Sequence, residues 1–330
     1  MPFIEEDDTV DPTYPRLVGD IGGTNARLAW VAAPGRLPER VKTYACAAYE
    51  SLESVIRAYL ADEGLGVPPW CAIGIANPVT GDWVQMTNHH WAFSIGALRD
   101  GLGLQRLLVL NDFTALAMSL PSLSGDDLRL VGGGRAVEGE PRALVGPGTG
   151  LGVSGLLSWG GGRLVPVHGE GGHVTLAAAD EEEEAVLRVL RRRFGHASAE
   201  RALSGPGLVH LYDAVCQLRG IAPAALSPAE VSQAGLSAQD PACEQALALF
   251  CSFLGTVAGN LALTLGARGG VYIGGGIVPR LGAWFDRSAF RRRFEDKGRF
   301  KSYLAEIPTY VVQAAHPALL GAARALDELS

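Results

Sequence analysis

Hydrophobic and polar positions alternate in short runs over the first third of the chain and predict strands. From Arg16 the segment LVGDIGGTNARLAWVAA contains two β-rich runs separated by a glycine-rich turn. The runs YACAAY, WCAIGIAN and RLLVLND are also typical of short, buried or half-buried strands. Between them, SLESVIRAYLADEG has helical spacing, with Ser51 as the expected N-cap and Gly64 as the stop. This alternation of strands and helices predicts an α/β unit.

The pattern changes after a second glycine-bearing strand pair, ALVGPGTGLGVSGLLSW, because the following chain is mostly helical. DEEEEAVLRVLRRRFGH starts with acids and ends with arginines, which complements the helix dipole and indicates a well-capped, solvated helix. ACEQALALFCSFLGTVAGNLALTLGA predicts a long apolar helix, central to a second unit. The strand–turn–strand unit occurs twice, near residues 20 and 148, which hints at a duplicated architecture with a ligand between the copies.

Bulk composition limits the class of protein. The 330 residues are enough for two packed units, and 48% hydrophobic with 19% charged residues is a globular composition. The net charge of −7 disfavours nucleic acid or an anionic membrane as the main partner. It leaves room for a nucleotide, whose phosphates are usually held by backbone amides and a metal ion. The five scattered cysteines predict buried thiols in a reducing cytoplasm rather than disulfides or structural zinc.

Two further segments bear on localisation and partners. Residues 1–15, MPFIEEDDTVDPTYP, are acidic and proline-containing, so we expect a disordered tail and not a secretory signal. No uninterrupted apolar stretch approaches the roughly 18 residues of a membrane span, which predicts a cytoplasmic protein. The basic run Arg291–Arg293 is followed at once by Phe-Glu-Asp, so a solvated helix face is expected there rather than a nucleic-acid site.

The first glycine-rich turn is a candidate phosphate site. Its candidate nucleotide-binding residues are Asp20, Gly22, Gly23, Thr24 and Asn25. The two glycines let backbone N–H groups approach a ligand without a Cβ in the way, and such a turn can form an anion-binding concavity. Thr24 adds a hydroxyl donor, and Asp20 can reach a magnesium ion, often through water. Gly-Gly is also common in ordinary hairpins, so this turn alone leaves both interpretations open.

Two more glycine-rich turns follow. GPGTGLG contains Gly148, Thr149 and Gly150 and has more glycine than a hairpin needs, so two such turns could grip a polyphosphate from two sides. GLGVSG also matches GxGxxG, but that fingerprint must open a helix, and here the chain continues as a strand, which argues against a dinucleotide fold. Gly275 and Gly276 follow the strand VYI and precede a helix start. They form either a tight turn or a close approach to the adenosine end of a nucleotide.

Catalytic chemistry is expected at Asn111 and Asp112, between the strand RLLVL and the helix FTALAMSL. Catalytic groups in α/β units tend to sit at the carboxyl ends of strands. A carboxylate near a hydroxyl can accept its proton as a phosphoryl group arrives. An aspartate at this position can equally be the N-cap of the helix.

The segment GEGGH brings Glu170 and His173 onto a loop after the strand LVPV. Both side chains could hydrogen-bond a polyol, and the flanking glycines would let a sugar come close. A metal site is the rival interpretation, but one histidine and one glutamate are too few ligands. Glu200, in HASAERALSGPG, looks on its own like a solvated helical acid.

Together these segments resemble one family, the bacterial glucokinases of the non-zinc type within the hexokinase–actin–Hsp70 ATPase superfamily. The matching pieces occur in the family's order over roughly residues 16 to 326: LVGDIGGTNARLA, PVTGDWVQMTNHHWAFS, LNDFTALAMSLP, GPGTGLGVS, GEGGHVTLA, SAERALSGPGLV, GGVYIGGGIVPR, FEDKGRFKSYL and HPALLGAARAL. The resemblance implies a two-lobed actin-like ATPase (ribonuclease H-like) α/β fold with the active site in the interlobe cleft. It implies a small domain of residues 16–122 plus 313–330 and a large domain of residues 123–312.

The resemblance also implies an activity: transfer of phosphate from ATP, with Mg²⁺, to the 6-hydroxyl of glucose, giving glucose 6-phosphate and ADP. Asp112 matches the family's catalytic base and Asn111 a sugar-binding residue, while Glu170, His173 and Glu200 match the remaining sugar ligands. The first two glycine-rich turns match the family's phosphate-binding turns. A homodimer is the expected assembly.

Several alternatives stay open. The acceptor could be mannose, fructose or N-acetylmannosamine, and the donor could be polyphosphate. A non-enzymatic sugar sensor would be expected to lack the base, whereas Asp112 is present. A chaperone-like ATPase of the same superfamily would need a peptide-binding domain, for which no chain length remains.

Overall fold

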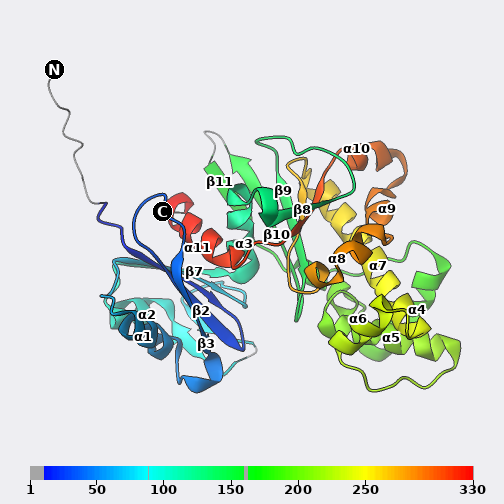
Figure 1. Cartoon of the computed structure of the whole chain (residues 1–330), viewed down its shortest axis with the longest axis horizontal. Helices are drawn as coiled ribbons and strands as arrows, with labels where there is room; N and C mark the ends of the chain where they lie inside the picture. Colours follow the sequence, from blue (N-terminus) through cyan, green and yellow to red (C-terminus); the bar gives the residue numbers. More distant parts are fainter. Residues whose placement is uncertain (1–10, 88, 160–162, 330) are drawn as a thin grey trace. The chain divides into compact units, whose positions relative to one another are not determined.

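A computed structural model describes residues 11–87, 89–159 and 163–329 (Figure 1). The chain divides into two compact units: unit 1 takes Met1–Ser122 and His316–Ser330, and unit 2 takes Leu123–Ala315. Of the expected N-terminal tail, residues 1–10 lie outside the described residues. Tyr14 packs against unit 1, with the Arg16 guanidinium 3.9 Å from its ring centre, so the packed chain includes residues before the expected boundary at 16.

Unit 1 is built on a five-stranded sheet with the order β3-β2-β1-β4-β7. Its strands are β1 (Arg16–Ile21), β2 (Asn25–Val31), β3 (Glu39–Ala45), β4 (Trp70–Ile75) and β7 (Arg106–Asn111), with a separate hairpin of β5 (Trp83–Gln85) and β6 (Ala92–Ser94). Its helices are α1 (Leu52–Glu63), α2 (Ile95–Leu102), α3 (Asp112–Ser119) and α11 (Pro317–Glu328). Leu17 lies in a core with residues of α1, and its neighbour Val18 in a core with residues of α11, because successive side chains of β1 point to opposite faces.

The local signals for α1 hold, and one strand ends earlier than expected. The Ser51 hydroxyl accepts a hydrogen bond from the Ser54 N–H at 3.1 Å, and Gly64 ends the helix in the left-handed conformation. The run YACAAY, predicted as a strand, is only partly one, since β3 ends at Ala45 and Cys46–Ala48 form a 3-10 helix. The Cys46 N–H donates to the Thr24 carbonyl (2.9 Å), which ties the chain to the first glycine-rich turn.

Unit 2 is built on a six-stranded sheet with the order β11-β10-β9-β12-β13-β8. Its strands are β8 (Leu128–Val131), β9 (Arg142–Pro147), β10 (Leu151–Trp159), β11 (Arg163–Val167), β12 (Val271–Ile273) and β13 (Thr309–Val312). Its helices are α4 (Glu181–Phe194), α5 (Gly205–Arg219), α6 (Pro228–Leu236), α7 (Pro241–Leu265), α8 (Val278–Arg287), α9 (Phe290–Glu295) and α10 (Lys301–Ala305).

The two sheets share one topology. In β3-β2-β1-β4-β7 the first two pairings are antiparallel and the next two parallel. The strands β11-β10-β9-β12-β13 repeat that succession, and β8 then extends the sheet. The duplication suggested by the two strand–turn–strand units is therefore present at the level of whole sheets.

Helix α7 forms the core of unit 2, as its apolar sequence predicts. Phe250, Phe253 and Leu254 are fully buried on it. By length and composition α7 could also cross a membrane, which the sequence analysis did not foresee, but 72% of its most apolar window is buried inside the protein. Gly255 and Gly259 leave room for α9, because a Cβ on either would overlap a backbone carbonyl of that helix.

The two charge runs, both expected to be solvated, are partly buried. Glu183 of α4 is 1% exposed and forms an ion pair with Arg293 of α9, which is 5% exposed. The solvated-face prediction holds for Arg292, which is exposed, and is wrong for Arg293. The reason is tertiary: the acids and the arginines are far apart in sequence but meet across α4 and α9.

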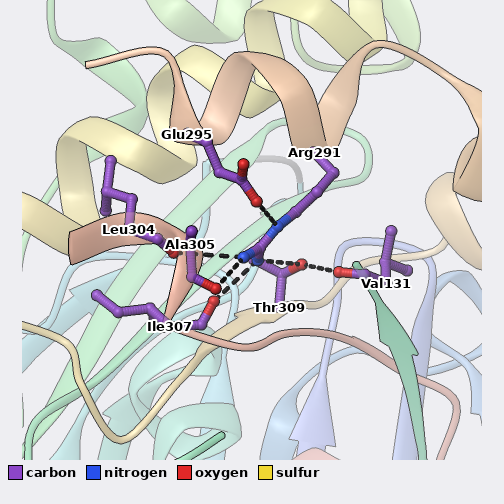
Figure 2. A network of polar contacts seen from close by, with 7 residues as sticks. All are labelled: Val131, Arg291, Glu295, Leu304, Ala305, Ile307 and Thr309. Carbon is purple, nitrogen blue, oxygen red and sulfur yellow. Dashed lines mark hydrogen bonds and ion pairs between the residues drawn. The ribbon is translucent and has the colours of Figure 1, made fainter. Parts of the chain in front are cut away.

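Arg291 is also withdrawn from solvent and connects three segments of unit 2. Figure 2 shows its guanidinium among carbonyls at the end of α10 and just after it. It donates to the carbonyls of Ala305 (3.0 Å) and Ile307 (2.8 Å) and pairs with Glu295 at 2.6 Å. Since the last carbonyls of a helix lack partners within the helix, Arg291 acts as a C-terminal cap for α10.

Candidate functional site

The first glycine-rich turn, residues 22–24, is the tight connection of the β1–β2 hairpin. The Gly22 N–H donates to the Asn25 carbonyl at 2.9 Å, and the Cys46 thiol donates to the Gly22 carbonyl at 3.4 Å. Within the described residues, the N–H groups of Gly23 and Thr24 donate to no protein acceptor. Thr24 is exposed. The turn can therefore offer two backbone donors and a hydroxyl to an anion.

Asp20 lies at the base of this turn. Its carboxylate is 3.2 Å from the Arg27 guanidinium, opposite it in the β1–β2 ladder. Burial raises the pKa of the Asp20 carboxyl above its ordinary value of 3.8, and Arg27 only partly offsets that effect. Arg27 and, more weakly, His316 lower this pKa, but burial outweighs them, so the carboxylate can accept a further positive charge.

Strand register brings the first turn and Asp112 to one edge of the unit 1 sheet. Ile21, the last residue of β1, is level with Ile75 of β4, and Ile75 is level with Asn111 of β7. The three strands are parallel, so their carboxyl ends meet at this edge. One strand separates β1 from β7, which corresponds to roughly 10 Å between strand axes. The turn and Asp112 thus emerge side by side from the sheet.

Asn111, and not Asp112, is the N-cap of α3. The Asn111 side-chain oxygen accepts from the N–H groups of Phe113 (2.9 Å) and Thr114 (3.2 Å). Asp112 is the first residue of the helix, half-buried, and its Oδ1 accepts from the Phe113 N–H at 2.8 Å. The capping role that the sequence left open for Asp112 therefore belongs to its neighbour. Gly74 of β4 is the residue beneath, where a Cβ would come 3.6 Å from the Asp112 Cα.

The sequence analysis did not single out Asn77, which follows β4 at the same edge. Its carbonyl accepts from the Asn111 side-chain amide at 3.4 Å. Its own side-chain oxygen accepts from the N–H (3.0 Å) and the hydroxyl (2.6 Å) of Thr87. A polar residue two positions after a parallel strand was the signal that could have identified it.

The second glycine-rich turn, residues 148–150, joins β9 to β10 in unit 2. The Gly148 N–H donates to the Gly150 carbonyl (2.8 Å), and the Gly148 carbonyl accepts from the N–H of Gly205, the first residue of α5 (2.8 Å). Thr149 is exposed. β10 continues directly from this turn as a strand, as the sequence predicted, so no dinucleotide-type helix follows. The turn occupies the same place in the duplicated sheet as the first one, because β9 and β10 correspond to β1 and β2 in strand order.

Gly275 packs beneath the second turn. Its φ is +77°, and a Cβ there would overlap the Pro147 carbonyl. The Gly274 N–H donates to the Val145 carbonyl at 2.9 Å. Gly276 is different, because it is exposed and a Cβ there would meet nothing within 4 Å. Gly275 therefore supports the turn by close backbone approach, whereas Gly276 borders open space.

Unit 2 contains three of the predicted sugar ligands, Glu170, His173 and Glu200. Glu170 and His173 are exposed at the ends of a short loop after β11, and the His173 N–H donates to the Glu170 carbonyl at 3.0 Å. The loop packs on β10, since a Cβ at Gly172 would overlap the Leu151 carbonyl. The Ala199 N–H donates to the Val174 carbonyl (2.9 Å), so Glu200 lies close to this loop in the chain that runs alongside it.

The structure thus makes two groups of predicted residues. Unit 1 holds the first turn with Asn111 and Asp112 at one sheet edge. Unit 2 holds the second turn with Gly275, Glu170, His173 and Glu200. The duplicated sheet topology, with a glycine-rich hairpin turn and carboxylates in each copy, is the arrangement expected of the two-lobed kinases that the sequence resembles.

Comparisons with known proteins make the assignment specific. A family model described as Glucokinase matches residues 17–329. A glucokinase of Aromatoleum aromaticum is 60% identical over 316 residues, covering 96% of this chain and 95% of the relative. A glucokinase of Chromobacterium violaceum is 56% identical, with 96% and 90% covered. The chain belongs to the glucokinase family.

Solved structures agree with this assignment. The crystal structure of a glucokinase from an Antarctic psychrotroph has a TM-score of 0.88 at 35% identity and covers 95% of this chain and 98% of its own. A ROK family glucokinase from Streptomyces griseus, solved in complex with glucose and AMPPNP, has a TM-score of 0.62 at 18% identity, covers 94% and 98%, and shows the fold alone. The expected fold class is confirmed.

Proposed function

We propose that this enzyme transfers the γ-phosphate of ATP to the 6-hydroxyl of glucose, giving glucose 6-phosphate and ADP, with Asp112 as general base. The observation that carries the proposal is the strand register of unit 1, which sets the first glycine-rich turn and Asp112 at the same sheet edge. A phosphate donor at the turn and an acceptor hydroxyl at Asp112 would then be neighbours. The glucokinases at 60% and 56% identity support the choice of sugar, and the complex of a distant relative with AMPPNP supports ATP as donor.

The rate of the chemical step depends mainly on alignment of the two substrates and on neutralisation of the phosphate charge. The acceptor oxygen forms a bond to the γ-phosphorus as the bond from phosphorus to the β,γ-bridging oxygen breaks. The hydroxyl proton passes to the Asp112 carboxylate. The Asn111 cap fixes the start of α3, so Asp112 enters the site on a rigid helix end. Positioned general bases contribute roughly 10²–10⁴ to the rate of such steps.

Each unit contains candidate ligands for the sugar and for the phosphates. We assign the hydroxyl contacts of glucose to Asn111, Glu170, His173 and Glu200. The phosphates are assigned to the two glycine-rich turns, through the N–H groups of Gly23 and Thr24 in the first and through Thr149 in the second. Gly275 supports the second turn, and Gly276 borders the nucleotide.

The residues present suit a magnesium ion carried by the nucleotide. Among the described residues no three His, Cys, Asp or Glu side chains converge on a metal site. Mg²⁺ is commonly held by one or two carboxylates together with waters and substrate phosphates, and Asp20 can supply one carboxylate. Bound there, the ion would neutralise phosphate charge. The buried, free cysteines suit a reducing cytoplasm, where we place the enzyme, and the family resemblance leads us to expect a homodimer.

The test is a coupled assay for glucose 6-phosphate with magnesium-ATP, run on the wild type and on Asp112→Asn. We expect robust wild-type turnover and a loss of at least about 10² in kcat for the variant, which should still bind glucose. If the wild type makes no product, a panel of hexoses and phosphate donors follows. Failure of every pair would sink the kinase proposal and favour a sugar sensor. Full activity in the variant would remove Asp112 from the mechanism.

A further inference from the structure

The carboxylate of Glu200 touches the second glycine-rich turn directly. Its Oε2 accepts a hydrogen bond from the Leu151 N–H at 2.9 Å, across 49 residues of sequence. Leu151 stands opposite Pro147 at the mouth of the β9–β10 hairpin. The contact therefore closes the turn at the point where it passes into β10.

Gly150 makes this contact sterically feasible. A Cβ at position 150 would come 2.5 Å from Oε2 of Glu200, so the space beside this glycine is taken by the carboxylate. Gly150 has no positive φ, so its backbone conformation does not require glycine. The glycine at this position is explained by the neighbouring carboxylate.

The backbone of Glu200 is held firmly. Its carbonyl accepts from the Ser204 hydroxyl at 2.9 Å, and the Ser204 hydroxyl in turn accepts from the Gly207 N–H at 3.0 Å as the N-cap of α5. The same helix start donates from Gly205 to the Gly148 carbonyl. One short segment thus anchors the turn at both ends, through Gly205 at its beginning and Glu200 at its end.

The second carboxylate oxygen has a different environment. In the part of the chain that the structure describes, Oε1 of Glu200 has no hydrogen-bond partner. The backbone beside Glu200 pairs with the end of the loop that carries Glu170 and His173, through the Ala199–Val174 hydrogen bond. Oε2 of Glu200 thus accepts from the second glycine-rich turn, whereas Oε1 is available to accept from a ligand hydroxyl.

We propose that Glu200 is a positioning residue for the nucleotide as well as a sugar ligand, coupling the two sites through the Leu151 N–H. The inference rests on the proposed function, which puts phosphate at the second turn and sugar at Glu200. A sugar hydroxyl that orients the carboxylate also orders the turn. By linkage, nucleotide and sugar must then favour each other's binding by the same factor.

The test measures nucleotide affinity in the absence of sugar, by titrating the full-length protein with magnesium-AMPPNP. We expect Glu200→Ala to weaken this affinity about 10-fold, because hydrogen bonds to charged groups are commonly worth that factor or more. Glu200→Gln keeps an oxygen that can accept from Leu151 N–H, so it should stay within about 3-fold of the wild type. His173→Ala is the matched control, since that side chain is assigned to the sugar only.

A reciprocal variant tests the coupling from the other side. Gly150→Ala places a methyl group against Oε2 of Glu200, and the flexible carboxylate must move. Glucose affinity, measured without nucleotide, should therefore fall about 10-fold although the mutated residue belongs to the phosphate turn. Thr149→Ala in the same turn should leave glucose affinity unchanged.

The outcomes separate the two proposals. Glu200→Ala that binds magnesium-AMPPNP as tightly as the wild type, while phosphorylating glucose poorly, leaves the kinase standing and overturns the coupling. Equal losses of nucleotide affinity in Glu200→Ala and His173→Ala would also overturn it, because within the described part of the chain no hydrogen bond joins His173 to the turn. A wild type that binds neither ligand contradicts the proposed function itself. Melting temperatures of all variants identify any that fail to fold. If Glu200→Ala does, Gly150→Ala carries the comparison, because unchanged glucose affinity in that variant also overturns the coupling.

Discussion

Glu183 and Arg293 form a buried ion pair that joins α4 to α9 across 110 residues of sequence. Asp180, the N-cap of α4, lies 3.4 Å from the same guanidinium. The second carboxylate oxygen of Glu183 accepts from the Ala179 N–H at 2.7 Å. The pair therefore also fixes the first turn of α4.

Removing one partner of this pair should be costly. Arg293→Ala leaves Glu183 buried without its ion-pair partner, and we expect a loss of about 3–5 kcal/mol in the free energy of unfolding. Urea denaturation measures it. Arg292→Ala, an exposed neighbour, is the control and should stay within about 0.5 kcal/mol of the wild type. The double variant Glu183→Leu/Arg293→Met should recover most of the loss, and a double variant as unstable as Arg293→Ala would contradict this account.

Asn111 combines a structural role with its proposed role in sugar binding. Asn111→Ala removes the α3 cap and should cost about 1 kcal/mol in the free energy of unfolding. Asn111→Asp retains an oxygen that caps the helix but loses the amide donor to Asn77, so its stability should remain near that of the wild type. Both variants should raise the KM for glucose. Thermal melts together with glucose titrations separate the two effects, and an Asp variant as unstable as the Ala variant would argue against the cap.

Gly275 and Gly276 should respond differently to the same methyl group. Gly275→Ala forces a left-handed alanine, at about 1–2 kcal/mol, and also pushes on the Pro147 carbonyl at the second turn. We therefore expect lower stability and a higher KM for ATP. Gly276→Ala meets open space and should change both quantities little. Steady-state kinetics at saturating glucose measures the KM for ATP of both variants. Equal increases in the two variants would refute the packing role of Gly275.

The ionised carboxylate of Asp20 should lower the stability of the fold, although it is the proposed metal ligand. Because burial raises the pKa of its carboxyl, the folded protein keeps this proton to higher pH than the unfolded chain does. The contribution of Asp20 to stability is thus fully present below the unfolded value near 3.8 and is lost as pH rises through the raised folded pKa. Asp20→Asn cannot ionise, so its stability relative to the wild type should increase as pH rises from about 4.

Urea denaturation of both proteins from pH 4 to pH 8 tests this sign. The affinity of Asp20→Asn for magnesium-AMPPNP should fall in the same samples, since the proposed metal ligand is gone. If the stability difference between Asp20→Asn and the wild type stays constant over this pH range, burial does not raise the pKa of the Asp20 carboxyl.

Local signals were enough to predict much of the fold. Ser51 and Gly64 bracket α1 because caps depend on neighbouring residues. The position of Asp112 between β7 and α3 was also predictable, because an apolar run ends and a helical pattern begins at this point of the sequence. The choice between Asn111 and Asp112 as N-cap was not, since both residue types cap helices and only the backbone geometry distinguishes them.

Contacts between residues far apart in the sequence could not be predicted from the sequence. Glu200 resembled a solvated acid without the family comparison, because its partner Leu151 N–H is a backbone group 49 residues away. Arg293 was assigned to solvent for the same reason, since a charge run carries no sign of the opposite run that it meets. Cys46, predicted in a strand, lies in a 3-10 helix, and its N–H donates to the Thr24 carbonyl. In each case the deciding contact joins distant segments.

Helix α11 gives unit 1 a particular order of assembly. It packs on α3, with Gly321 lying so close to the Ala115 carbonyl that a Cβ would overlap it (Figure 1). All of unit 2 is translated between these two helices. A ribosome therefore completes unit 2 while the helix that starts with Asp112 still lacks its packing partner. The nascent chain holds its proposed base in a settled position only after α11 has emerged.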